Sequence, residues 1–302
     1  MKTVYLSLVS LLIVLALGTK AETLMGNLNA NPVSSPDKKE KKKNKKKEQE
    51  TTVQPKIDGD PYTVNGVVFW MIRVEGGKFT MGATAEQGSV AQSNEKPAHQ
   101  VTLSEYYIGQ TEVTQALWQA VMGTNPSCFT GDNGYSDNMN RPVEGVSWED
   151  CQAFIKQLNY LTGKNFRLPT EAEWEFAARG GVKSHGYVYS GSNDITEVAW
   201  YWNTIPSRIK GKEGYGTQHV ATKAPNELGI YDMTGNVWEW CNDKYGYYNA
   251  NPQMNPKGPS SGAYRVYRGG CWDNDAAGCR VAYRYGSKPD GKEDFLGLRL
   301  AL

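Results

Sequence analysis

The sequence predicts a single α+β domain at residues 57–302 with little regular secondary structure. The 302 residues include 32 Gly, 9 Trp and 18 Tyr, a composition typical of a loop-rich fold packed by aromatic side chains. Short stretches of both helical and strand character occur in this region, and no segment of 20–50 residues repeats. The length is sufficient for one large core. A helical bundle, a solenoid and a propeller are therefore excluded.

Three short helices are expected. The first covers about 112–122, where apolar residues recur on one face. The second begins at Ser147, because Asp150 three residues later completes a capping-box-like start, and it ends at Gly163. The third begins at Thr170, because Glu173 stands three residues later at the reciprocal capping position, and it ends at Gly180-Gly181. The apolar stripe of the second helix consists of Cys151, Phe154, Ile155 and Leu158.

Strands are expected at three places, 67–74, 99–108 and 264–269. The stretch 187–255 is long, aromatic and rich in turn residues, and it has no clear period. Structureless loops of that length are uncommon inside a compact domain. We therefore expect an ordered but irregular backbone there, held by packing, buried polar contacts or an ion.

The first 21 residues have the pattern of a secretory signal peptide. Lys2 supplies the positive start, Val4–Gly18 the apolar stretch, and Thr19-Lys20-Ala21 a cleavage site. The stretch is short for a membrane span, although an uncleaved anchor stays open, and no Cys follows it as a lipoprotein signal would require. We expect an exported protein of the periplasm, the cell envelope or the outside medium.

Residues 22–56 form a Lys-rich linker, with eight Lys between Lys38 and Lys47. A segment so charged and so poor in apolar residues is expected to remain a solvated tether. The alternative is electrostatic contact with an anionic envelope surface. Residues 1–56 carry a net charge of +6 and residues 57–302 a net charge of −5, so the acidic domain is a poor candidate for binding nucleic acid.

Several motifs follow one another in an order that identifies a family. The motifs are GGKFTMG (76–82), EKPAHQV (95–101), EVT (112–114), PV (142–143), VSW (146–148), RLPTEAEWE (167–175), GNVWEW (235–240), RVYRGG (265–270), CRVA (279–282) and GLR (297–299). From about residue 62 onward the chain resembles the formylglycine-generating enzyme, or sulfatase-modifying factor, family. The RLPTEAEWE and GNVWEW blocks are the most specific. The resemblance implies a variant of the C-type-lectin-like fold.

The activity that the resemblance implies is the oxidation of a sulfatase Cys to formylglycine with O₂ and copper. Two Cys five residues apart hold Cu(I) in active members, because soft thiolates select that ion. Here the corresponding loop, 269–280, is about three residues shorter and contains only Cys271 and Cys279. Cys271 stands where the family has Ser, and Cys279 lies beyond the second catalytic position. The usual copper site is not expected, and a rebuilt Cys271/Cys279 pair is the alternative.

The chain has five Cys, an odd number that leaves at least one thiol without an internal partner. Export favours disulfides. The resemblance favours a structural bridge between Cys241 and Cys279, although the connectivity cannot be derived from sequence. Cys128 and Cys151 either pair or remain apart, and Cys151 lies on the apolar stripe of the second helix.

The segment 230–239 matches a calcium-binding segment of the family. The resemblance implies side-chain ligands from Asp232 and Glu239 and backbone carbonyl ligands from Gly235 and Val237. Hard oxygen donors around a tight glycine turn suit Ca²⁺. Such an ion would be structural. The alternative is that Asp232 and Glu239 only accept hydrogen bonds from loop amides.

Together these observations favour an exported, non-oxidase binding or structural module of the cell envelope. Its ligand would be a protein, a peptide or a glycan, bound at a variable rim formed by residues 271–296. Trp200, Tyr201 and Trp202 are the best candidates for exposed aromatic contacts. The other Trp are expected in the core. The alternative function is a protein-cysteine oxidase that uses the rearranged Cys271/Cys279 copper site.

Overall fold

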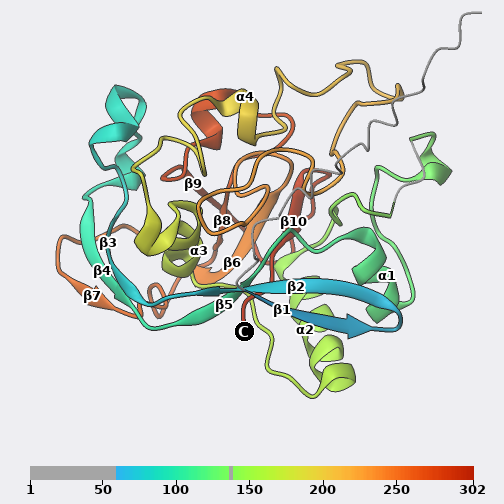
Figure 1. Ribbon diagram of the computed structural model, residues 1–302, viewed down its shortest axis with the longest axis horizontal. Helices are drawn as coiled ribbons and strands as arrows, with labels where there is room; N and C mark the ends of the chain where they lie inside the picture. The colour runs from blue at the N-terminus through green and yellow to red at the C-terminus, as the bar shows by residue number, and fades with distance from the viewer. Residues whose placement is uncertain (1–58, 136–138) are drawn as a thin grey trace, which may run out of the picture. The chain divides into compact units, whose positions relative to one another are not determined.

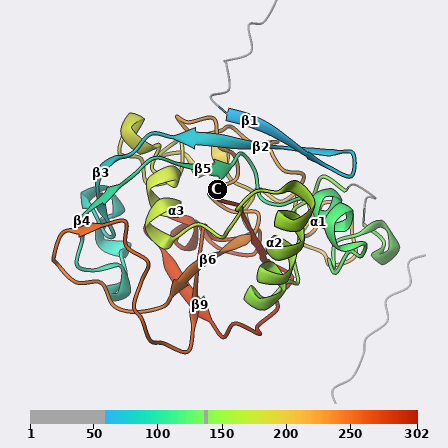
Figure 2. The ribbon, with the colours of Figure 1, turned by 90° about the horizontal axis from the view of Figure 1, so that it is seen from below.

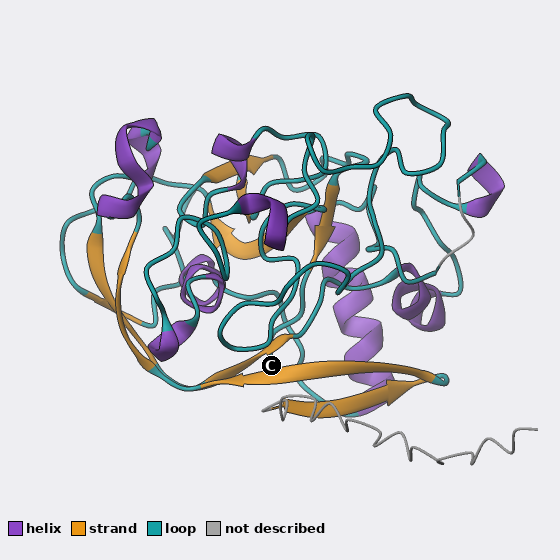
Figure 3. Ribbon diagram, turned by 45° about the horizontal axis from the view of Figure 1, so that its top comes forward, coloured by secondary structure: helices purple, strands orange, loops and turns teal. Residues whose placement is uncertain are grey.

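A computed structural model describes residues 59–135 and 139–302. The predicted signal peptide (1–21) and Lys-rich linker (22–56) lie outside the described residues. Of the residues described, 22% are helical and 23% are in strands, and loops dominate the ribbon in Figure 3. The prediction of a single α+β domain with little regular secondary structure is confirmed.

The strands of the described residues form three small sheets. Their order is β1-β2-β5, β10-β6-β8-β9 and β3-β4-β7. The hairpin of β1 and β2 is the long blue ribbon in Figure 1, and it turns at Asn65-Gly66, where both residues have positive φ as a two-residue turn requires. The strands are β1 (Gly59–Val64), β2 (Val67–Val74), β3 (Gly77–Met81), β4 (His99–Leu103), β5 (Tyr106–Gly109), β6 (Trp238–Lys244), β7 (Gln253–Met254), β8 (Arg265–Arg268), β9 (Arg284–Ser287) and β10 (Leu296–Leu298).

The predicted helix starts are confirmed at two capping boxes. Ser147 and Asp150 cap α2 reciprocally, and Thr170 and Glu173 cap α3 in the same way. The first helix begins later than predicted, because Thr114 is its N-cap and accepts from the Leu117 amide. The helices are α1 (Gln115–Met122), α2 (Trp148–Thr162), α3 (Glu171–Ala178) and α4 (Ile195–Val198), with 3₁₀ turns at Ala85–Val90, Ser93–Glu95, Gly131–Asn133, Gly181–Lys183 and Ala276–Cys279. Figure 2 shows α2 and α3 with β6 between them in that view.

The strand predictions are confirmed in part. The stretch 67–74 is β2, and β8 lies within 264–269. The stretch 99–108 is not one strand: it divides into β4 and β5, which pair in different sheets. The irregular region 187–255 contains β6, which is buried along most of its length and shows no sustained alternation of apolar and polar residues.

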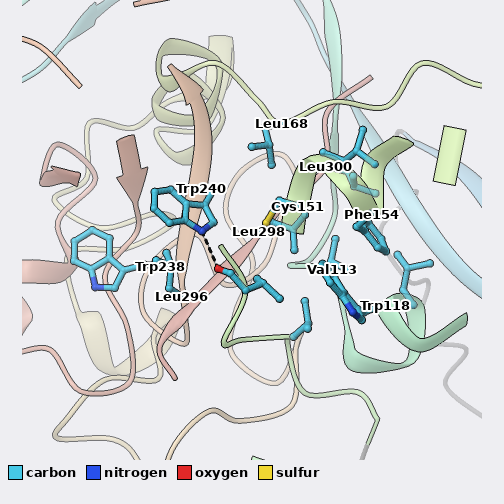
Figure 4. Close-up of a cluster of buried hydrophobic side chains, with 14 of the residues drawn as sticks. Val113, Trp118, Cys151, Phe154, Leu168, Trp238, Trp240, Leu296, Leu298 and Leu300 are labelled. Carbon is cyan, nitrogen blue, oxygen red and sulfur yellow. Dashed lines mark hydrogen bonds between the residues drawn. The ribbon is translucent and has the colours of Figure 1, made fainter. Parts of the chain in front are cut away.

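The larger hydrophobic cluster joins α1 and α2 to β6 and β10 (Figure 4). The rings of Trp118 and Phe154 stack with centroids 4.7 Å apart, which fixes α1 against α2. The indole nitrogen of Trp240 donates to the carbonyl of Val146 at 3.0 Å, the dashed line in Figure 4. The predicted stripe of α2 faces this cluster, and Trp238 and Trp272 are buried in it as well.

Residues 296–302 connect parts of the chain that are far apart in sequence. β10 pairs in parallel with β6. The carbonyls of Leu298 and Leu300 accept from the amides of Val113 and Gly109, both within 2.9 Å, and Ala301 pairs with Arg167. Because residues 296–302 run through the core, the side chain of Arg299 is fully buried there.

No helix among the described residues is both long and apolar enough to cross a membrane.

Candidate functional site

A buried ion pair between Glu239 of β6 and Arg299 organises the region where calcium ligands were predicted. The Arg299 Nη2 lies 2.7 Å from Glu239 Oε1, and its Nε lies 2.9 Å from Oε2. The indole nitrogen of Trp174 in α3 donates to the same Oε2 at 2.6 Å. None of these three side chains is exposed. The two oxygens of Glu239 therefore accept from protein donors on both sides.

Two more buried carboxyl groups lie beside this ion pair. Glu112 accepts from the Val237 amide at 3.1 Å and from the Asn236 side chain at 2.8 Å. Asp232 accepts from the Ala221 amide at 2.7 Å through Oδ2. Burial raises the pKa of Asp232 to about 6, and burial together with the charges of Asp232 and Glu239 raises the pKa of Glu112 well above its usual range.

The predicted calcium ligands fit an ion only in part. The Oδ1 of Asp232 is buried and has no hydrogen-bond donor, as a vacant metal ligand would. Glu239 does not fit, because Arg299 and Trp174 already occupy both of its oxygens. In residues 59–135 and 139–302, no three His, Cys, Asp or Glu side chains are placed to hold a metal ion. The predicted set of Asp232, Gly235, Val237 and Glu239 thus lacks one of its side-chain ligands.

The loop that carries Cys271 and Cys279 folds back on itself, so the two residues are neighbours. The Cys279 Sγ lies 4.0 Å from the carbonyl oxygen of Cys271. The Cys271 amide and thiol both donate to the Oδ1 of Asn274, at 3.0 and 3.3 Å. Asp275 caps the following 3₁₀ turn by accepting from the Gly278 amide at 3.0 Å. Each thiol is therefore directed at an oxygen atom of the loop.

The buried thiols do not fit a Cu(I) site. Cys271 is 2% exposed and Cys279 is not exposed. Burial raises the pKa of Cys279 to about 12 and that of Cys271 well above its usual range. Copper binding requires the thiolate, which an apolar surrounding disfavours. A tight backbone closes the loop further, because a Cβ on Gly270 would lie 2.6 Å from the Cys279 Sγ.

The predicted Cys241–Cys279 disulfide is not formed. All five cysteines are free thiols, and these two lie in different hydrophobic clusters. Cys241 belongs to β6 and packs with α3, whereas Cys279 packs with Ala199 and Tyr201. Cys128 is exposed and Cys151 is buried, and neither forms a disulfide.

The predicted aromatic triplet divides between core and surface. Tyr201 is buried at 5% exposure. Trp200 and Trp202 are half-buried and each has a cation near its ring, Lys223 at 4.4 Å and Arg208 at 5.1 Å from the ring centroid. The Trp202 amide donates to the carbonyl of Asn274 at 3.0 Å, which joins this aromatic residue to the cysteine loop.

Beside the cysteine loop lie exposed or half-buried carboxylates and aromatic residues. We call Trp202, Tyr215, Asp273 and Asp294 the rim. Tyr215 packs edge-on against the buried Trp272, with centroids 4.9 Å apart. Burial and the nearby charges of Asp273 and Asp294 raise the pKa of Tyr215, and burial and the charge of Asp294 raise the pKa of Asp273. Two residues of the rim, Asp273 and Asp294, fall within the predicted variable stretch 271–296.

Sequence reasoning missed a buried carboxyl group beside the exposed Cys128. Glu144 is not exposed, and it accepts from the amides of Cys128 and Phe129, each at 3.0 Å. Burial raises the pKa of Glu144 to about 7. The contact between Glu144 and Cys128 could not be recognised in the sequence, because the residues between them form no periodic pattern that would bring the two together.

Comparison with known proteins matches residues 63–302 to the family model described as the sulfatase-modifying factor enzyme 1-like domain. The chaperone protein LppX of Paenibacillus barcinonensis is 36% identical over 270 residues, which cover 76% of this chain and 85% of that protein. A formylglycine-generating enzyme of Streptomyces coelicolor is 32% identical over 287 residues, which cover 76% of this chain and 88% of that protein.

The fold is also found among solved structures. Treponema denticola variable protein 1 superposes with a TM-score of 0.70 at 34% identity, covering 80% of this chain and 98% of that one. The similar proteins thus include one named as a chaperone, one named as an enzyme and one named as a variable protein. Since one fold accommodates these different descriptions, the activity has to be argued from the residues of this chain.

Proposed function

The chain belongs to the sulfatase-modifying factor family, and on that basis we propose that it is an exported, non-oxidase binding module of the cell envelope. The observation that carries the proposal is the closed cysteine loop. The family's copper chemistry needs two accessible thiolates, whereas Cys271 and Cys279 are buried and directed at loop oxygens.

The rim supports the binding half of the proposal. Aromatic rings and carboxylates that share one surface supply both contact area and directional hydrogen bonds to a protein, peptide or glycan. Trp272 and Asn274 support this surface from below, since Trp272 packs under Tyr215 and Asn274 accepts from the Trp202 amide. Substitutions in the rim could therefore change ligand preference without changing the core.

Localisation is part of the same proposal. The signal peptide at 1–21 would direct export, and the Lys-rich linker at 22–56 would hold the domain away from the envelope or contact its anionic surface. The basic tether and the mildly acidic domain carry opposite net charges, which favours attachment to an anionic surface through the tether.

The oxidase is the second candidate, because the loop does bring Cys271 and Cys279 together. An assay separates the two functions. The full-length protein is incubated with Cu(I), O₂ and a Cys-x-Pro-x-Arg peptide, and the peptide is followed by mass spectrometry, with the Streptomyces coelicolor enzyme as the positive control. We expect unmodified peptide. An aldehyde product that disappears in both Cys271→Ser and Cys279→Ser would establish the oxidase.

A binding screen tests the module itself. Peptide and glycan arrays are probed with the wild-type protein and with a Trp202→Ala, Asp273→Asn double variant. Ligands that bind the wild type and not the double variant would support the rim. Ligands that bind both equally would place recognition elsewhere on the domain. A control variant, Asp60→Asn, changes an exposed carboxylate of β1 outside the rim.

A further inference from the structure

A cavity lies at the start of α3, among residues that have no part in the cysteine loop. Its volume is about 180 Å³. Glu171 of α3, Asp243 of β6 and Arg284 of β9 contribute polar groups to its wall, and residues of the segment 246–259 also line it. The cavity is small for a cofactor and is of a size for a side chain or a fragment.

Asp243 is the unusual member of this wall. It is 3% exposed, and its Oδ2 accepts from the Glu171 amide at 3.1 Å. No Lys, Arg or His within the described ranges makes an ion pair with it. A buried carboxylate without a cation is costly, so such a group either takes up a proton or acquires a partner.

The other charges of the cavity are already matched. Arg284 binds both oxygens of Glu171, each at 2.6 Å, and donates to the carbonyl of Gly246 at 2.7 Å. The Tyr248 hydroxyl donates to Glu171 Oε1 at 3.0 Å. Neither Glu171 nor Arg284 is therefore in need of a ligand, and the unmatched charge is that of Asp243.

We propose that this cavity binds an alkylammonium group, of which the lysine side chain of a protein or peptide is the example, with its nitrogen paired to Asp243. Met81, Pro256 and Pro259 provide apolar contact for an alkyl stem. Tyr247 lines the same cavity and is 91% exposed, so its ring stands at the entrance. A hard divalent ion fits less well, because it needs about six oxygen ligands and the wall offers one unpaired carboxylate.

The pKa of Asp243 predicts how binding depends on pH. Burial and the charges of Glu171 and Glu173 raise the pKa of Asp243 to about 8. The hydrogen bond from the Glu171 amide and the charge of Arg284 oppose this shift. Arg265 of β8 also interacts with Asp243, and His99 and Tyr248 line the cavity. A cation must displace the proton of Asp243. Binding should therefore tighten roughly tenfold between pH 7 and pH 9, while an alkylammonium of pKa about 10.4 stays charged.

The test is calorimetric titration of the full-length protein with n-butylammonium chloride and with Nα-acetyl-lysine amide. We expect binding of both, tighter at pH 9 than at pH 7, and no binding of 1-butanol, which has the same stem without the charge. Asp243→Asn keeps the acceptor for the Glu171 amide and removes the charge, and it should abolish binding. Asp60→Asn, which changes an exposed carboxylate of β1 outside both the cavity and the rim, is the matched control and should bind as the wild type does.

Two results would overturn the proposal. One is the absence of any binding to the wild type at pH 9, which would leave a cavity filled by water alone. The other is equal binding by Asp243→Asn and wild type. If Asp243→Asn does not fold, the comparison of butylammonium with 1-butanol decides, together with Tyr247→Ala. That variant alters an exposed side chain and should weaken binding several-fold.

Discussion

Arg299 holds Glu239 through both carboxylate oxygens in a part of the core where neither side chain meets solvent. The guanidinium also donates to the carbonyls of Gly109 and Tyr231, at 2.9 and 2.8 Å. One side chain thus connects β5, the loop before β6 and β6 itself. In the family motif this Glu is the middle residue of Trp-Glu-Trp, and here its partner is Arg299.

Glu239→Gln should be among the most destabilising single changes in the domain. It leaves the buried Arg299 without its counter-charge, which costs about 3–5 kcal/mol of unfolding free energy. Urea unfolding followed by tryptophan fluorescence measures the loss. Glu105→Gln is the control, because it breaks the exposed pair of Glu105 with Arg73 and should cost below about 1 kcal/mol. Equal effects of the two variants would contradict the structural role of Glu239.

Calcium should not stabilise the domain strongly. Since Arg299 and Trp174 occupy the oxygens of Glu239, the melting temperature in millimolar CaCl₂ should equal that in EDTA. Differential scanning fluorimetry measures both. The opposite result, a calcium-dependent rise that Asp232→Asn removes, would show that Glu239 exchanges its partners for an ion and would restore the predicted site.

Stability should fall as the pH rises from about 4.5 to 7. In the folded protein burial raises the pKa of Glu144 to about 7 from its ordinary value of about 4.5, so the folded state holds a proton that the unfolded state has released. The contribution is complete below the unfolded pKa and is lost as the pH rises through the folded one. One such group changes the unfolding free energy by about 1.4 kcal/mol per pH unit.

Glu144→Gln should flatten this dependence, because the amide does not titrate. Unfolding curves at pH 5, 6 and 7 for the wild type and the variant provide the comparison. Glu149→Gln, in which an exposed residue of α2 changes, should keep the wild-type slope. An identical slope in Glu144→Gln would assign the pH dependence to other buried acids.

A single thiol should react quickly with a disulfide reagent in the native protein. Cys128 is exposed, whereas Cys151, Cys241, Cys271 and Cys279 are buried. Burial and the neighbouring Glu144 raise the pKa of Cys128, so even this reaction should be slower than that of a free thiol at the same pH. Absorbance assay with and without urea should give one thiol and then five.

Cys128→Ser should remove the fast phase and leave the slow one. Persistence of a fast phase that Cys271→Ser removes would mean that the cysteine loop opens in solution, and the oxidase would regain support. A total below five thiols in urea without reductant would show that a disulfide forms in the protein.

Much of the fold could be predicted where the signal is local. Ser147 and Asp150 specify the start of α2 by themselves, and the stripe of α2 is buried as its period indicates. β6 was missed because both of its faces are largely covered, so the alternation of Trp238-Glu239-Trp240 does not continue to Lys244. The break between β4 and β5 was missed because it depends on which sheets the two strands join.

The candidate site was harder to predict, because it too depends on contacts between residues far apart in the sequence. The closeness of Cys271 and Cys279 follows from the short loop that joins them, and the sequence therefore indicates it as an alternative. Their burial depends on residues far away in sequence, as does the pairing of Glu239 with Arg299, and no spacing reveals either. The choice of calcium ligands rested on the local segment alone, in which Arg299 does not appear.

The path of residues 296–302 has a consequence for how the domain is made. A nascent chain that has not yet supplied these residues lacks one of the two strands that pair with β6, the acceptors for Val113 and Gly109, and the counter-charge of Glu239. Such non-local pairing delays folding until late. The domain should therefore complete its fold only after these last residues have been supplied.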